Sequence, residues 1–253
     1  MFGMRRREFI RLLGSAAAWP LAARAQQAGK LPTIGFLRAN TASTQRRSTD
    51  AFVQRLRELG WIENRTVAIE YRWGEGRDER FAEIAAEFVR LKVDVILTFA
   101  TPSSLAVKKA TAVIPIVFAA AGDPVGTGLV ASLARPGGNI TGLSIQQTDL
   151  ASKRLEMLRE VLPGLRTVAI LANISSPNSV LEMTEAQAAA HTLGLAVVTS
   201  EVRGAEDIAP AFDALKGRAD ALYVVTDPLV NTNRIRINNL ALGARLPTTG
   251  AEP

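Results

Sequence analysis

Short apolar segments alternate with longer amphipathic ones along this sequence, and this alternation constrains the fold more than any other feature. Residues 33–37 form an apolar run, whereas residues 50–59 place four apolar side chains on one face of a helix. Strands that are apolar throughout are typical of parallel sheets, because helices cover both faces of such a sheet. The sequence therefore predicts an α/β protein in which strands and helices follow one another.

The alternation extends from residue 33 to residue 225. The strands predicted by short apolar runs cover residues 33–37, 67–71, 93–99, 116–120, 140–144, 168–171, 196–199 and 221–225. The helices predicted between them cover residues 50–59, 81–91, 103–110, 150–162, 180–193 and 208–215. A break in phase near residues 143–150 favours two Rossmann-like lobes with parallel sheets, 26–144 and 145–253. A single doubly wound sheet is the alternative.

The first 25 residues have the three parts of an export signal. A charged run leads into the apolar stretch 12–23, and an A-x-A cleavage pattern ends at Ala25. The charged run contains Arg6 and Arg7 in a context that resembles the twin-arginine export motif. An anchoring helix is the weaker alternative, because the stretch is shorter than the roughly 18 residues of a membrane span. We expect cleavage after Ala25 and a periplasmic mature chain that begins at Gln26.

Composition argues against several classes of function. The formal charge is +6, but residues 1–25 hold five Arg and one Glu, so the mature chain carries +2. Because basic residues are not clustered with aromatic ones, we expect no nucleic-acid partner. Cysteine is absent, which excludes disulfides, thiol catalysis and a lipid-anchored amino-terminal Cys.

The residues needed for common catalytic and cofactor sites are not found together. His191 is the only histidine, and without a nearby Ser, Cys or carboxylate constellation it is expected on a helix surface. No Gly-x-Gly-x-x-Gly motif follows the first strand and no phosphate-binding loop occurs, so we expect no cofactor. Glu182 and Glu185 lie on a predicted helix, where a solvated face explains them.

Polar residues follow the predicted strands at the places where open α/β sheets bind ligands. Arg38 and Asn40 follow the first strand, and Thr101 and Ser103 follow the strand that ends at Phe99. Thr101 or Ser103 is expected to cap the helix that begins there, which leaves N–H groups for a carboxylate. Capping alone also explains these two residues.

Matching loops of the second lobe supply Asn173, Ser175, Thr226 and Asp227. If these loops face the loops of the first lobe, the two sets form a cleft. An amino-acid-like ligand needs an anion cradle and a partner for its ammonium group, and Asp227 or Asp123 provides that partner. Asp followed by Pro is also common in turns, so both roles stay open for the two aspartates.

A longer pattern joins these loops. The segment 118–130, FAAAGDPVGTGLV, continues as 132–142, SLARPGGNITG, and is accompanied by Ala100-Thr101-Pro102, by PIVF at 115–118 and by Ala172-Asn173. This ordered set extends over residues 34–247. It resembles the ABC-transporter substrate-binding family related to tryptophan-binding lipoproteins.

The resemblance implies a type I periplasmic-binding-protein fold, whose two lobes close on a small, amino-acid-like solute and deliver it to an ABC permease in the inner membrane. It implies no catalysis, and we expect a monomer. The candidate ligand-binding residues are Arg38, Asn40, Thr101, Ser103, Asp123, Asn173, Ser175, Thr226 and Asp227. A secreted α/β enzyme and a sensory ligand-binding module remain the alternatives.

One prediction concerns the end of the sequence. Relatives in this family continue beyond Pro247, so we expect residues 248–253 to leave the second lobe incomplete and a sheet edge or helix face uncovered. The purified 1–253 chain is therefore predicted to be destabilised or impaired in solute binding, as measured by thermal unfolding and a binding titration. Cooperative unfolding together with full-affinity binding would contradict this prediction.

Overall fold

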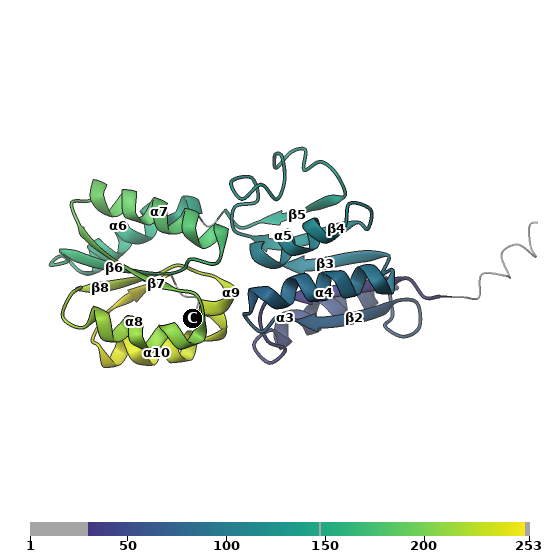
Figure 1. Ribbon diagram of the computed structural model, residues 1–253, viewed down its shortest axis with the longest axis horizontal. Helices are drawn as coiled ribbons and strands as arrows, with labels where there is room; N and C mark the ends of the chain where they lie inside the picture. Colours follow the sequence, from purple (N-terminus) through teal and green to yellow (C-terminus); the bar gives the residue numbers. More distant parts are fainter. Residues whose placement is uncertain (1–29, 147, 251–253) are drawn as a thin grey trace, which may run out of the picture.

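Two α/β lobes make up the structure, a computed structural model that describes residues 30–146 and 148–250 (Figure 1). Each lobe is built on its own parallel sheet, with helices packed on both faces. The prediction of two parallel sheets is therefore confirmed, and the alternative of one doubly wound sheet is wrong. The predicted export signal lies outside the described residues.

The first lobe has a five-stranded sheet in the order β2-β1-β3-β4-β5, with all neighbours parallel. Its elements are β1 (Thr33–Arg38), α3 (Arg46–Glu58), β2 (Ala68–Trp73), α4 (Asp78–Leu91), β3 (Val95–Phe99), α5 (Thr101–Ala110), β4 (Ile116–Ala121) and β5 (Ile140–Ser144). On one face of the sheet, α4 and α5 contribute Phe81, Phe88 and Val107 to the core. On the other face lies α3, none of whose side chains is fully buried.

The second lobe has a four-stranded sheet in the order β7-β6-β8-β9, again parallel. Its elements are η1 (Thr148–Leu150), α6 (Ala151–Val161), β6 (Thr167–Asn173), α7 (Pro177–Thr192), β7 (Ala196–Val202), η2 (Ala205–Asp207), α8 (Ile208–Leu215), β8 (Ala221–Val224), α9 (Pro228–Thr232), α10 (Arg234–Gly243) and β9 (Thr248–Thr249). The sequence did not predict α9, α10 or β9. The helix α10 was not predicted because its apolar residues lie on more than one side: Ile237 is buried, whereas Ile235 is exposed.

The strand β6 shows why the apolar runs of the sequence are continuous. Val168 and Ile170 pack into one core with residues of α6 and α7, whereas Ala169 and Leu171 pack into a second core with residues of α8 and α10. Successive side chains of a strand point to opposite faces of the sheet. Because helices cover both faces, the five inner positions of β6, residues 168–172, are all apolar.

The expectation of a solvated Glu182 is wrong. Its side chain on α7 is fully buried, and its Oε1 accepts hydrogen bonds from Arg154 Nη1 at 2.8 Å and Tyr223 OH at 2.9 Å. Burial raises the pKa of Glu182 to about 7, and the two donors oppose this rise. The helical pattern did not reveal this environment because Arg154 and Tyr223 come from α6 and β8. Glu185, one turn further on, is exposed as expected.

The two lobes meet at the carboxyl ends of their strands. The chain passes from the first to the second lobe between Ser144, at the end of β5, and Ala151, at the start of α6. Contacts across the boundary include Asn40 Nδ2, which donates to Pro228 O at 3.1 Å and Thr232 Oγ1 at 3.3 Å. Loops that follow strands in both lobes therefore face one another, as ligand sites in open α/β sheets require.

Candidate functional site

A cleft of about 180 Å³ lies between the lobes at these strand ends. The first lobe lines it with Arg38, Asn40, Gln45, Phe99, Ala100, Thr101, Pro102, Ala120, Gly122 and Ile145 of the connecting segment. The second lobe lines it with Ser176, Asn178, Thr226, Asp227, Pro228 and Asn231. Since both lobes contribute, a molecule held here contacts both at once.

Among the residues that the structure describes, Arg38 is a buried cation without an anionic partner. It ends β1, and only 7% of its surface is exposed. Its guanidinium carbon lies 3.9 Å from the centre of the Phe99 ring, and its Nη2 donates to Gln45 Oε1 and to Ser48 Oγ at 2.8 Å. Burial lowers its pKa to about 10, with no nearby carboxylate opposing this shift, yet Arg38 stays protonated at neutral pH. A buried charge of this kind calls for an anion from outside the protein.

Two helices begin at the cleft without a side-chain cap. Both α5, ten residues long, and α7, sixteen residues long, start beside a proline and lack a side-chain hydrogen bond at the first turn. The amino terminus of a helix has unpaired N–H groups and a partial positive charge. Ala100, Pro102 and Asn178, at these two termini, line the cleft. Together with Arg38 they give this part of the cleft a positive potential.

The expected capping by Thr101 or Ser103 is wrong. Thr101 Oγ1 accepts a hydrogen bond from Gly122 N at 3.1 Å, which ties the start of α5 to the loop after β4. Ser103 Oγ donates backwards to Phe99 O and is fully buried. Both hydroxyls therefore brace neighbouring backbone.

Backbone strain also concentrates at the cleft. Ala100 has φ +71° and ψ 160°, and Ala120 has φ +55°. Residues with a Cβ rarely adopt these conformations, which cost about 1–3 kcal/mol each and persist only where surrounding structure imposes them. Ala100 directly follows β3, and Ala120 is the second-last residue of β4. The strained conformations therefore occur where these two strands end at the cleft.

Asp227 is the anionic group of the cleft. It precedes α9, where its Oδ1 accepts from Val230 N at 3.0 Å and its Oδ2 accepts from Asn173 Nδ2 at 2.8 Å. Burial raises its pKa to about 6, although these donors favour the ionised form. No ion pair with Asp227 forms among residues 30–146 and 148–250. A cationic group in the cleft would relieve this desolvated carboxylate.

Gly122 and Asn178 form a close contact between the lobes. A Cβ built on Gly122 would overlap the amide of Asn178 from the opposite lobe. Asn178 is 5% exposed, and its Oδ1 is buried without a hydrogen-bond partner within the described chain. A buried acceptor without a partner is costly, so the Oδ1 atom of Asn178 is placed to accept a hydrogen bond from a molecule in the cleft.

Five of the nine residues singled out from the sequence line the cleft: Arg38, Asn40, Thr101, Thr226 and Asp227. The other four lie behind or beside it. Ser103 is a buried residue of α5, and Asn173 donates a hydrogen bond to Asp227. Ser175 is exposed, and its N–H donates to Asn173 Oδ1. Asp123 closes a turn in which its Oδ1 accepts from Gly126 N at 2.8 Å.

Five polar or aromatic residues of the cleft were not singled out from the sequence: Gln45, Phe99, Ser176, Asn178 and Asn231. Phe99 was assigned to a strand, and Gln45 and Asn178 were left without a role. Asn178 stands directly after Pro177, the first residue of α7, and a polar residue in that position is the signal that would have found it.

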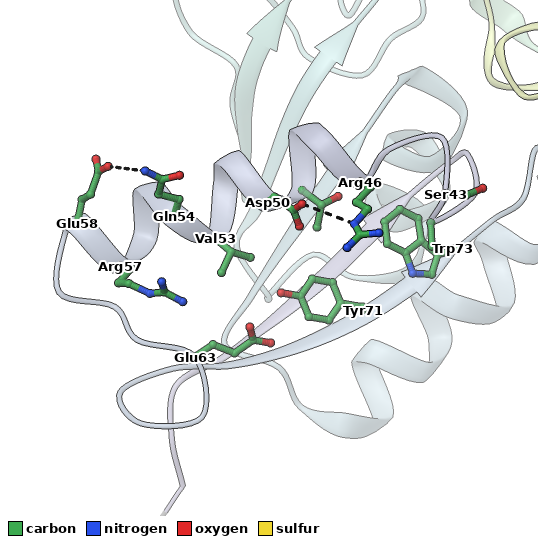
Figure 2. Close-up of a pocket in the computed structure, with 12 residues that line it drawn as sticks. Ser43, Arg46, Asp50, Val53, Gln54, Arg57, Glu58, Glu63, Tyr71 and Trp73 are labelled. Carbon is green, nitrogen blue, oxygen red and sulfur yellow. Dashed lines mark hydrogen bonds and ion pairs between the residues drawn. The ribbon is translucent and has the colours of Figure 1, made fainter.

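A larger hollow of about 840 Å³ lies elsewhere, over α3 and β2 (Figure 2). Tyr71 and Trp73 form its floor, and the ion pair of Arg46 with Asp50, 3.9 Å apart, lies along α3. Both members of that pair are exposed. Because the first lobe alone lines this hollow, lobe closure cannot enclose a molecule there. The interlobe cleft is therefore the candidate site.

Among the residues that the structure describes, no group of three or more His, Cys, Asp or Glu side chains is placed to hold a metal ion. Among the helices that the structure describes, none combines the length and apolar character needed to cross a bilayer. The cleft therefore has to be interpreted from its charges, its helix termini and its aromatic ring.

The fold and site define a two-lobed ligand-binding protein, and sequence comparison identifies the family. The sequence model of the ABC transporter substrate-binding proteins matches residues 43–253, so the chain belongs to this family. The chain is 29% identical over 201 residues to a tyrosine-binding protein of Clostridioides difficile, which covers 79% of this chain and 58% of that protein. The chain thus spans less than two thirds of this curated relative.

Solved structures confirm the type I periplasmic-binding-protein fold. An ABC domain from Streptococcus pneumonia in complex with L-Trp superposes with a TM-score of 0.79 at 25% identity, covering 88% of this chain and 75% of that one. The ligand-free, open structure of a substrate-binding protein with adhesive properties from Clostridium difficile gives a TM-score of 0.55 at 27% identity with the same coverage. The TM-score is thus higher with the L-Trp complex than with the ligand-free, open structure.

The Gly122–Asn178 contact yields a test of this lobe arrangement. Gly122→Ala places a methyl group against Asn178, and overpacking of this kind costs about 1–3 kcal/mol. We expect the substitution to shift the protein toward a more open arrangement, measured as a longer distance between spin labels on the two lobes. Gly164→Ala is the control, because its Cβ meets no atom within 4 Å. Equal distances in the two variants would contradict the contact.

Proposed function

We propose that this chain is the exported solute-binding component of an ABC importer and that its cleft captures a zwitterionic, amino-acid-like solute. The single observation that carries the proposal concerns two buried charges of one cleft: within the described part of the chain, Arg38 has no anionic partner and Asp227 has no cationic one. A free amino acid supplies both missing charges. The tyrosine-binding relative and the L-Trp complex support this choice of solute.

The carboxylate of the solute is assigned to the first lobe and to the start of α7. Arg38 donates through its guanidinium, and the uncapped termini of α5 and α7 add backbone N–H donors. Hydrogen bonds to a charged group contribute about 1.5–3 kcal/mol each. These donors belong to both lobes, so a carboxylate that reaches both favours the closed arrangement.

The ammonium group of the solute is assigned to Asp227, and the apolar part to Phe99. The carboxylate of Asp227 is fixed by Asn173 and Val230, so it needs little reorganisation to accept from the solute. The ring of Phe99 lies under the Arg38 guanidinium and lines the cleft next to Ile145. An aromatic or aliphatic solute side chain fits against this surface, because aromatic rings bury large apolar areas.

Transport follows from lobe closure. A ligand stabilises the lobe arrangement that it binds better, by as much as its affinities for the two arrangements differ. A solute that contacts Arg38 on one lobe and Asp227 on the other binds the closed arrangement better. The closed protein then presents the solute to a permease in the inner membrane, acts as a monomer and performs no chemistry on its cargo.

The two charge assignments predict opposite specificities for two variants. Asp227→Asn should weaken L-tyrosine binding about 10- to 100-fold, the equivalent of one hydrogen bond to a charged group, and should not weaken binding of 3-(4-hydroxyphenyl)propionate, which has no amine. Arg38→Met should weaken L-tyrosine by a similar factor and spare tyramine, which has no carboxylate. Isothermal titration calorimetry measures all three ligands.

Matched controls and pH complete this test. Asp50→Asn and Arg46→Met remove the same charges from exposed positions on α3 and should leave all affinities unchanged. Because a proton on Asp227 competes with the solute ammonium, wild-type affinity should fall as the pH drops below about 6, while Asp227→Asn shows no such fall. Loss of all three ligands by the same factor in both variants would refute the assignments.

Export yields a separate prediction. Replacing Arg6 and Arg7 together by Lys should prevent export and leave a full-length precursor in the cytoplasm, because the twin-arginine route reads this pair. Wild-type protein from the periplasm should begin at Gln26, and an intact-mass measurement checks this. Arg5→Lys serves as the control and should export normally. Processing of the double variant at the wild-type rate would refute twin-arginine export.

A further inference from the structure

Asp78 lies where the two lobes touch, outside the lining of the cleft. It is the first residue of α4, two positions after Gly76 in the turn that follows β2. A Cβ built on Gly76 would lie 3.4 Å from Thr232 Oγ1 and 3.5 Å from Leu229 Cα. This turn of the first lobe therefore packs against α9 of the second lobe, the helix that Asp227 caps.

The carboxylate of Asp78 is partly buried and has no hydrogen bond or ion pair within residues 30–146 and 148–250. Burial raises its pKa to about 6, and the charges of Asp227 and then Glu79 add to this rise. Asp78 and Asp227 come from opposite lobes, so their proximity exists only when the lobes are together. Each ionised carboxylate disfavours the other in that arrangement.

We propose that Asp78 and Asp227 form a charge gate, in which the repulsion between two carboxylates from opposite lobes resists closure until a solute with a cationic group enters the cleft. The gate rests on the proposed function, because it determines which solutes the two lobes close around. Asp78 touches no solute. It is a positioning residue that determines specificity through the energy of the closed arrangement.

Other charges nearby do not neutralise this pair. On the Asp78 side, Arg77 and Arg80 both pair with Glu75, and Glu79 adds a further negative charge. On the opposite side α9 carries no charged residue, and Arg234, the first residue of α10, donates to Asn231 O. Glu182 on α7, whose pKa the charge of Asp227 raises, is a further acidic group on this side, and Arg154 pairs with Glu182 at 2.8 Å. The repulsion therefore persists at neutral pH, where both carboxylates are ionised.

The gate has a consequence for selectivity. Arg38 and the helix termini would also attract solutes that carry a carboxylate and no amine, such as simple organic acids. Closing on such a solute would bring Asp78 and Asp227 together with no cationic group on the solute, while Arg38 pairs with the solute carboxylate. A repulsion equivalent to one pKa unit changes affinity by about tenfold. The gate thus favours zwitterions over simple acids.

The test compares Asp78→Asn with Glu79→Gln, its matched control. Both residues are acidic and lie in the first turn of α4, so both variants lose one charge at the same helix terminus. Asp78→Asn should raise affinity for 3-(4-hydroxyphenyl)propionate about tenfold and change affinity for L-tyrosine much less. Glu79→Gln should change neither beyond about twofold. Equal effects of Asp78→Asn on both ligands, or equal effects of the two variants, would overturn the gate.

A ligand-free measurement separates the gate from the proposed function. The chain has no Cys, so Glu83→Cys on α4 and Lys216→Cys after α8 allow spin labels on the two lobes. As the pH falls through about 6, the distance between the labels should shorten in wild type and shorten less in Asp78→Asn. Failure of L-tyrosine to bind would refute the proposed solute. The same pH response in both proteins would refute the gate.

Discussion

The buried guanidinium of Arg38 is the interaction on which the account of this protein depends. A charge removed from water without a partner is costly, and the fold keeps it at the end of β1 by stacking it on Phe99 and hydrogen bonding it to Gln45 and Ser48. None of these contacts neutralises the charge. An anion that enters the cleft lowers the cost of burying this charge, and this relief contributes to the free energy of solute binding.

The architecture places complementary charges on the two sides of one cleft. Parallel strands in each lobe end at the same edge of their sheet, and the lobes face each other across those edges. The first lobe contributes Arg38 and the start of α5, and the second contributes Asp227 and the start of α7. Strained alanines at positions 100 and 120 turn the chain into the cleft. A zwitterion matches this arrangement better than an anion or a cation alone.

The sequence predicted the strands and helices that repeat with a clear period. Strands such as β6 are apolar on both faces, and this pattern survives in the sequence because helices cover both sides. The helix α10 was missed because its buried and exposed apolar residues, Ile237 and Ile235, follow no single face. Local periodicity therefore predicts helices with a single apolar face and strands that are buried on both faces. It overlooks a helix such as α10, whose apolar residues do not share one face.

The site was predictable in its location and less so in its membership. Polar residues after strands pointed to Arg38 and Asp227, since strand ends mark ligand sites in this class of fold. Ser103 and Asn173 share that position in the sequence, yet their side chains turn back to brace the backbone and Asp227. The partners of Glu182 depend on contacts between distant elements, which no local pattern encodes.

A crystal structure of the chain grown with L-tyrosine tests the central claim most directly. The account predicts the solute in the cleft between the lobes, with its carboxylate oxygens about 2.7–3.2 Å from the Arg38 guanidinium nitrogens and its ammonium group on Asp227. A solute bound in the hollow over α3 and β2, or bound in the cleft with its carboxylate away from Arg38, would contradict it.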